Sequence, residues 1–150
     1  MTEVIGIDHI YLTVRDLAAS RRFYDVAMPI LGFRAGAFEI GGDPHVAYTN
    51  RHFGFVLRPA RSAASHDPYA PGLHHFCLRV DSAGDVAAAA ADLRAAGIVV
   101  SEPRLYPEYA PDYVAIFLED PDGIRLEVTN YRQERRERHD RWEAQEKEKR

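Results

Sequence analysis

The stretch Gly72-Leu-His-His-Phe-Cys-Leu-Arg-Val80 repeats an earlier one, Gly6-Ile-Asp-His-Ile-Tyr-Leu-Thr-Val14, almost residue for residue. The alignment places His9 over His75, and a helical run that closes on a glycine follows each copy. A stretch of this length that occurs twice indicates two copies of one supersecondary unit. We therefore read the chain as a duplicated unit.

Each repeated stretch has the alternation of a strand, which separates two faces. One face is apolar in both copies, formed by Ile10, Leu12 and Val14 and by Phe76, Leu78 and Val80. The other face begins with a histidine, in the sets His9, Tyr11, Thr13 and His75, Cys77, Arg79. We call this second face the polar front, and we expect function to reside on it.

The segments that follow each repeat have the same order. In the first unit we expect a strand at 5–14, a helix at 18–31 capped by Asp16, and strands near 33–40, 45–49 and 53–58. In the second we expect a strand at 73–80, a helix at 85–96, and strands near 98–102, 113–118 and 124–129. The predicted fold class is α+β, with two βαβββ modules that form a curved eight-stranded mixed sheet around a cavity.

The expected domain covers residues 1–130, with module one at about 4–59, a linker at 60–71 and module two at about 72–130. Residues 131–150 form a charged C-terminal extension, for which acid-before-base pairs at helical spacing predict a solvated helix. Tyr131 and Trp142 are its candidates for docking onto the body or onto a second subunit. The alternative is a helical extension with no chemical role.

Composition limits the classes of function. The net charge is −4, and residues 131–150 contribute +2 to it, with eight Lys/Arg and six Asp/Glu. Residues 1–130 therefore have a net charge of −6. This acidic character argues against a nucleic-acid partner. No apolar run is long enough to cross a bilayer, and the N-terminus does not look like a signal peptide, so we expect no membrane association. The single cysteine, Cys77, suits a reducing compartment, and we expect a cytoplasmic protein.

Glu127 lies on the polar front of the last expected strand, because it alternates with Leu126 and Val128. Together with His9 and His75 it makes two imidazoles and one carboxylate on adjoining strands. This 2-His-1-carboxylate set suits a divalent ion such as Fe, Mn, Zn or Ni and leaves coordination positions for a substrate. We therefore predict a metal-centred cavity.

Other side chains are candidates for the wall of that cavity. Aromatic residues would suit an apolar or aromatic small-molecule substrate, although ordinary packing explains them equally well. Arg125, like Arg79, is placed to meet an anionic substrate or to pair with carboxylates, and Cys77 is expected to line the pocket rather than to bind metal. The candidate substrate-binding residues are Tyr11, Tyr48, Cys77, Tyr113, Phe117 and Arg125.

The repeat, its two histidines and the sequence Asp120-Pro-Asp-Gly-Ile-Arg-Leu-Glu-Val128 resemble the vicinal oxygen chelate superfamily of glyoxalases, bleomycin-resistance proteins and extradiol dioxygenases. The resemblance covers residues 4–130. It implies that His9, His75 and Glu127 are metal ligands. Relatives that move protons draw a fourth metal-site residue from the last strand of the first unit, where this chain has Val56.

The function that this resemblance implies is a metal-dependent lyase, dioxygenase or transferase. Its substrate would bind through two neighbouring oxygens, and Glu127 would belong to the catalytic centre. The alternative is a metal-free protein that sequesters a drug-like or aromatic ligand, as bleomycin-resistance proteins do. A further expectation is a homodimer, because two modules must meet with their polar fronts together and open sheet edges need cover.

Overall fold

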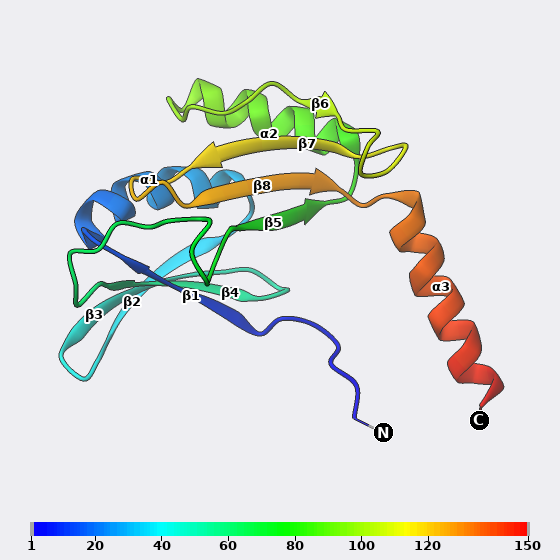
Figure 1. The fold of residues 1–150 in the computed structure, drawn as a ribbon, viewed down its shortest axis with the longest axis horizontal. Coiled ribbons are helices and arrows are strands. Elements are labelled where there is room, and N and C mark those ends of the chain that lie inside the picture. Colours follow the sequence, from blue (N-terminus) through cyan, green and yellow to red (C-terminus); the bar gives the residue numbers. More distant parts are fainter. Residues whose placement is uncertain (1, 150) are drawn as a thin grey trace.

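The computed structural model describes residues 2–149 as two sheets and three helices (Figure 1). The first module comprises β1 (His9–Val14), α1 (Leu17–Ile30), β2 (Arg34–Ile40), β3 (Asp43–Thr49) and β4 (Gly54–Pro59). The second comprises β5 (His75–Val80), α2 (Ala83–Ala95), β6 (Arg104–Leu105), β7 (Val114–Glu119) and β8 (Arg125–Asn130). The helix α3 (Gln133–Glu148) follows.

The two modules have the same topology. Their strand orders are β1-β4-β3-β2 and β5-β8-β7-β6, with β1 parallel to β4, β5 parallel to β8 and the other neighbours antiparallel. This confirms the α+β class and the βαβββ modules. Within the described chain, however, the eight strands form two four-stranded sheets and not one continuous sheet. The strands that carry the repeat, β1 and β5, each lie at a sheet edge.

One strand of the second module lies later than expected. The sequence predicts it at 98–102, whereas β6 covers only Arg104–Leu105. Ser101 contacts β7 through a backbone N–H bond to the carbonyl of Phe117, at 3.0 Å, and its hydroxyl accepts from the N–H of Phe117. These two contacts hold 98–102 beside the sheet without forming a ladder.

Local signals explain where the helices begin and end. The Asp16 side chain accepts the N–H of Ala19 at 3.0 Å, as its place before α1 predicts. Ser82 and Asp85 form a capping box at the start of α2. Gly32 and Gly97 follow the two helices, each with a φ of 85°, a conformation that glycine adopts without steric cost.

The apolar backs of both modules belong to one core. The rings of Phe55 on β4 and Phe76 on β5 lie 5.2 Å apart between centroids, and α1 and α2 contact each other as well as the sheets. Along β1 and β5, the back residues are buried or half-buried, whereas every second residue is exposed. The polar fronts of the two sheets therefore face away from the shared core.

A buried hydrogen bond joins the modules. The hydroxyl of Tyr24, on α1, donates to Oδ2 of Asp120 in the β7–β8 turn at 2.9 Å, and both residues are buried. Burial raises the pKa of the Asp120 carboxyl, although the backbone N–H of Ile124 and the Tyr24 hydroxyl oppose this shift. The turn thus connects the second module to the helix of the first.

We expect Tyr24→Phe to lower the free energy of unfolding by about 1–3 kcal/mol, because it leaves a buried carboxylate oxygen without its donor. Chemical denaturation followed by circular dichroism measures the change. Tyr69→Phe is the matched control, since Tyr69 is 87% exposed. Equal stability of the two variants would contradict a role for the Tyr24–Asp120 bond.

The extension forms the helix that its charge pattern predicts. α3 runs from Gln133 to Glu148, contains no buried residue and projects from the body in Figure 1. Trp142 is 57% exposed, so it does not dock onto its own chain. Among residues 2–149, none of the helices combines the length and the apolar character that crossing a membrane requires.

Candidate metal and substrate site

Two of the three predicted ligands meet on the polar front of the second sheet. β5 and β8 run parallel, with Cys77 opposite Glu127, so His75 and Glu127 are diagonal neighbours on one face. His75 Nε2 lies 3.2 Å from Glu127 Oε2. Two ligand atoms that each lie roughly 2.0–2.2 Å from one metal ion are about 3.0–3.4 Å apart when the ligand–metal–ligand angle lies between the square-planar and tetrahedral values. The spacing of this pair fits a shared metal ion.

The surroundings of Glu127 fix its carboxylate. Its side chain is 5% exposed, whereas that of His75 is 37% exposed. The Tyr113 hydroxyl donates to Glu127 Oε1 at 2.5 Å. Burial, followed by this hydrogen bond, raises the pKa of Tyr113, so the hydroxyl keeps its proton and remains a donor. Tyr113 therefore occupies one carboxylate oxygen and leaves the other facing His75.

His9 lies apart from this pair, at the start of β1 in the first sheet. Its side chain is 55% exposed, and its Nδ1 lies 2.7 Å from Oδ2 of Asp8. In residues 2–149, no group of three His, Cys, Asp or Glu side chains is placed to hold a metal ion. Within one chain the residues thus supply two of the three predicted ligands, and the complete set does not fit an ion.

Four of the predicted substrate-binding residues surround Glu127. Phe117 on β7 lies opposite it in the register, and the guanidinium of Arg125 lies 4.0 Å from the centre of the Phe117 ring. Cys77 is its neighbour on β5, where desolvation and then the charge of Glu127 raise the thiol pKa to about 12. The thiol is therefore protonated at neutral pH, as a pocket-lining residue would be. Tyr113 completes this group.

The other two predicted substrate-binding residues lie in the first module. Tyr11 is 43% exposed on its polar front, with its ring 5.5 Å from that of His9. The prediction that Tyr48 binds substrate is wrong, because its side chain has no exposed surface and lies on the opposite, helix-covered face. It packs against Phe55 and donates a hydrogen bond to Asp25 of α1 at 2.8 Å. Tyr48 thus belongs to the core.

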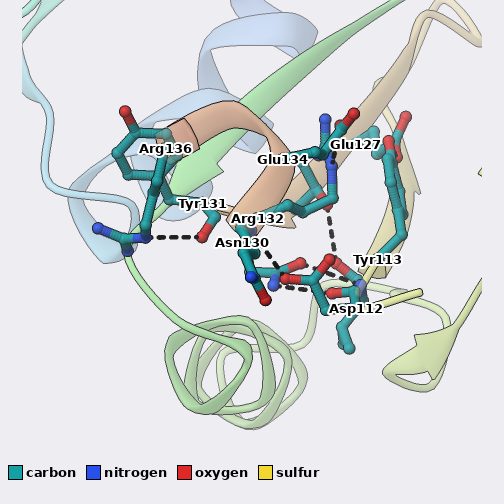
Figure 2. A network of polar contacts seen from close by, with 11 residues as sticks. Asp112, Tyr113, Glu127, Asn130, Tyr131, Arg132, Glu134 and Arg136 are labelled. Carbon is teal, nitrogen blue, oxygen red and sulfur yellow. Dashed lines mark hydrogen bonds and ion pairs between the residues drawn. The ribbon is translucent and has the colours of Figure 1, made fainter. Parts of the chain in front are cut away.

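Sequence reasoning missed two groups of residues around Glu127. The rings of Tyr106 and Tyr109, in the loop before β7, each pack against Tyr113 and extend the aromatic wall. The second group is Arg132 alone, whose guanidinium lies 4.4 Å from the centre of the Tyr113 ring (Figure 2). The run of tyrosines in 106–113 was a signal for the first group, but nothing in the charged extension singled out Arg132.

Two clefts elsewhere on the described chain do not include the ligand pair. One of about 660 Å³ lies between Arg15 and Asp122, and one of about 900 Å³ lies between the end of α1 and α2. Neither is lined by His9, His75 or Glu127. The candidate site is therefore an open face of the second sheet rather than either of these clefts.

Known proteins share both the sequence pattern and the fold. The Glyoxalase/Bleomycin resistance protein/Dioxygenase superfamily matches residues 6–128. The uncharacterized protein YqjT of Bacillus subtilis is 30% identical over 124 residues, which cover 80% of this chain and 94% of that protein.

Solved structures agree with this match. A glyoxylase/bleomycin resistance protein/dioxygenase domain from Frankia sp. EAN1pec superposes with a TM-score of 0.70 at 25% identity, covering 87% of this chain and all of that one. A lactoylglutathione lyase from Agrobacterium tumefaciens has the same fold, with a TM-score of 0.64 at 20% identity and coverage of 87% and 96%. The chain is therefore a member of the glyoxalase/bleomycin resistance protein/dioxygenase superfamily.

Proposed function

We propose that the protein is a metal-dependent enzyme that binds a small molecule through two neighbouring oxygens. The observation that carries this proposal is the pair His75–Glu127, whose 3.2 Å spacing fits two ligands of one ion. When bound, a divalent ion there supplies Lewis-acid stabilisation for negative charge on the substrate oxygens. A lyase, dioxygenase or transferase reaction is part of the same proposal, and the superfamily match supports a reaction of this kind.

The residues around the pair have separate tasks in this proposal. Tyr113 holds its proton on the hydroxyl and orients the Glu127 carboxylate toward His75. The rings of Phe117 and Tyr113 exclude water from one side of the ligand pair and give an aromatic substrate a surface to pack on. Arg125, above the Phe117 ring, supplies positive charge beside the bound oxygens.

We further propose that a second copy of the chain completes the site. The backs of both sheets are engaged in one core, so His9 cannot turn toward His75 and Glu127 without breaking that core. A two-fold dimer would place β1 of one copy beside β5 of the other and bring His9 to its partner's His75–Glu127 pair. Val56, opposite Tyr11 in the register, would then leave the fourth protein position apolar.

Exposed apolar residues support such a dimer. The segment before β1 belongs to no strand, and Val4, Ile5 and Ile7 in it are 86%, 98% and 61% exposed. Open strand edges and exposed apolar segments are features that folded chains usually cover. If this segment packed along the β5 edge of a second copy, both the open strand edge and the exposed apolar residues would be covered. Assembly in the cytoplasm, which the single Cys77 suits, is part of the same proposal.

Metal analysis of the purified protein tests this function. We expect about one divalent ion per chain in protein purified without chelators, with loss on dialysis against a strong chelator and recovery on addition of Mn, Fe, Ni or Zn. Catechols, 2-oxoaldehyde–thiol adducts and electrophilic antibiotics are then screened for turnover by the reloaded protein. Protein that binds none of these metals at micromolar concentration would exclude the enzyme.

That negative result would favour the second candidate, a metal-free binding protein. The observation in its favour is that no three-ligand group exists within the described single chain. The aromatic wall of Tyr106, Tyr109, Tyr113 and Phe117 would then serve as the binding surface. Binding of an aromatic ligand with the same affinity before and after chelation distinguishes this candidate from the enzyme.

A further inference from the structure

We propose that His45 presents a hydrogen-bond acceptor on the polar front of the first sheet and there binds the hydroxyl group of a neutral phenol. The site consists of the imidazole of His45, on β3, and the rings of Phe38, on β2, and Tyr11, on β1. The inference goes beyond the proposed function, because it requires neither a metal ion nor a second copy of the chain.

The register of the first sheet places His45 on this front. Ala47 lies opposite Val56 on β4, and Val56 lies opposite Tyr11 on β1. His45 is two residues before Ala47, so it shares a face with Tyr11. Phe38 lies directly opposite His45, on the edge strand β2 (Figure 1). Aromatic residues of two other strands are therefore close enough to contact the imidazole.

Two aromatic rings enclose most of this imidazole. The Phe38 ring stacks on it, with 5.0 Å between the centroids and 26° between the planes. The Tyr11 ring meets it edge to face, with 5.9 Å between the centroids. His45 is consequently 3% exposed, although it does not face the core, whereas Phe38 and Tyr11 are themselves exposed. The imidazole thus lies between two rings that offer apolar surface to a ligand.

One nitrogen of His45 is already engaged by the protein. Its Nδ1 lies 2.8 Å from the backbone carbonyl oxygen of Asp43. A carbonyl oxygen only accepts hydrogen bonds, so Nδ1 carries the hydrogen, and in the neutral imidazole Nε2 carries a lone pair. The carboxylate of Asp43 is occupied separately, by Arg58 and Arg61. The contact with the carbonyl therefore fixes the orientation of the ring and makes Nε2 the acceptor.

The other nitrogen has no partner, but it is not sealed inside the protein. In residues 2–149, Nε2 of His45 takes part in no hydrogen bond. The enclosed side-chain polar atoms without a partner in the same residues are Ser20 Oγ and His66 Nε2. Since Nε2 of His45 is not one of these enclosed atoms, it reaches the surface. A ligand can therefore approach this lone pair directly, whereas the rest of the imidazole is covered.

The contacts of the imidazole define the chemistry of its ligand. The ligand must donate a hydrogen, which a carboxylate or phosphate anion without a proton cannot do. Arg58 and Arg61 pair with the one carboxylate of Asp43, so an ammonium donor would meet net positive charge nearby. A neutral hydroxyl remains, and the rings of Phe38 and Tyr11 favour a hydroxyl that is carried on an aromatic ring. A phenol meets all of these conditions.

Titration of the full chain with phenol and with anisole, in the presence of a strong chelator, tests the proposal. Anisole has the same ring but no hydroxyl hydrogen. Long-range proton–nitrogen spectra of the imidazoles should show the hydrogen of His45 on Nδ1, and phenol at millimolar concentration should shift the Nε2 signal to saturation. We expect anisole to bind about fivefold more weakly or worse, because it cannot form the hydrogen bond to Nε2.

His45→Phe keeps an aromatic ring between Phe38 and Tyr11 but removes the acceptor. In ligand-detected spectra its affinity for phenol should fall about fivefold or more, to the level of its affinity for anisole. His52→Phe is the matched control, because His52 is exposed in the turn before β4, and it should bind phenol as the parent does. If His45→Phe does not fold, the two titrations of the parent protein still decide the question.

A hydrogen on Nε2 with none on Nδ1, equal affinities of the parent for phenol and anisole, or undiminished phenol binding by a folded His45→Phe variant would each overturn the proposal. The outcome is independent of the enzyme hypothesis. Protein that binds phenol at His45 but takes up no divalent metal would refute the enzyme and retain this site. Protein that takes up metal but shows no shift of the His45 signal with phenol would refute this site alone.

Discussion

Replacing His75 with alanine is expected to reduce bound metal from about one ion per chain to less than about one tenth. The change removes one of three ligands and leaves Glu127, which Tyr113 already holds, as the remaining donor on that sheet. A site with two ligands from separate chains cannot close around an ion with useful affinity. Inductively coupled plasma mass spectrometry after gel filtration measures the stoichiometry.

His139→Ala is the matched control, because His139 lies on α3 and is largely exposed. It should keep the metal content of the parent protein. Circular dichroism of both variants checks that the fold is retained, which we expect since the His75 side chain is itself partly exposed. Full metal occupancy in His75→Ala would show that this histidine is not a ligand.

Mixing two variants that each lack a different metal ligand is expected to restore metal binding if the site is shared between chains. His9→Ala lacks the ligand of the first module, and Glu127→Ala lacks one ligand of the second. In a mixed dimer, one interface then combines His9 from one chain with His75 and Glu127 from the other. After random exchange half of the dimers are mixed, so about one ion per four chains should bind.

Sedimentation at micromolar concentration accompanies this experiment, with an expected mass about twice the 17.0 kDa of the chain. A site built within one chain would give no recovery, because every chain in the mixture lacks a ligand. A monomer in sedimentation would refute the dimer directly. Recovery that requires prior unfolding and refolding of the mixture would still count for the shared site, since strongly bound dimers exchange slowly.

The sequence carries the fold almost completely because its signals are local and occur twice. Alternation in the two repeats predicts which residues of β1 and β5 face the core, and the structure has each histidine on the exposed side. The Asp16 side chain accepts the N–H of Ala19, three residues further along the chain, so the start of α1 can be predicted from local sequence. The predicted position of β6 was wrong because a strand of two residues is too short to show an alternating pattern.

The candidate site was less predictable because it depends on how separate elements meet. Alternation sorts the faces of one sheet, but it does not say how the fronts of two sheets are oriented toward each other, so the separation of His9 from Glu127 was not foreseen. Tyr48 was misplaced because a tyrosine suits a pocket and a core equally, and its bond to Asp25 is a tertiary contact. Stacking of Arg132 on Tyr113 is likewise invisible in a charged helical pattern.

The exposed position of Trp142 has a consequence for spectroscopy. It is the only tryptophan, so fluorescence excited at its absorption edge reports on the environment of α3 and on nothing in the core. Emission should therefore be close to that of the unfolded chain already in the native state, and denaturation of the body is better followed by circular dichroism. Conversely, a shift of this emission to shorter wavelength would mark the moment at which the projecting helix meets another surface.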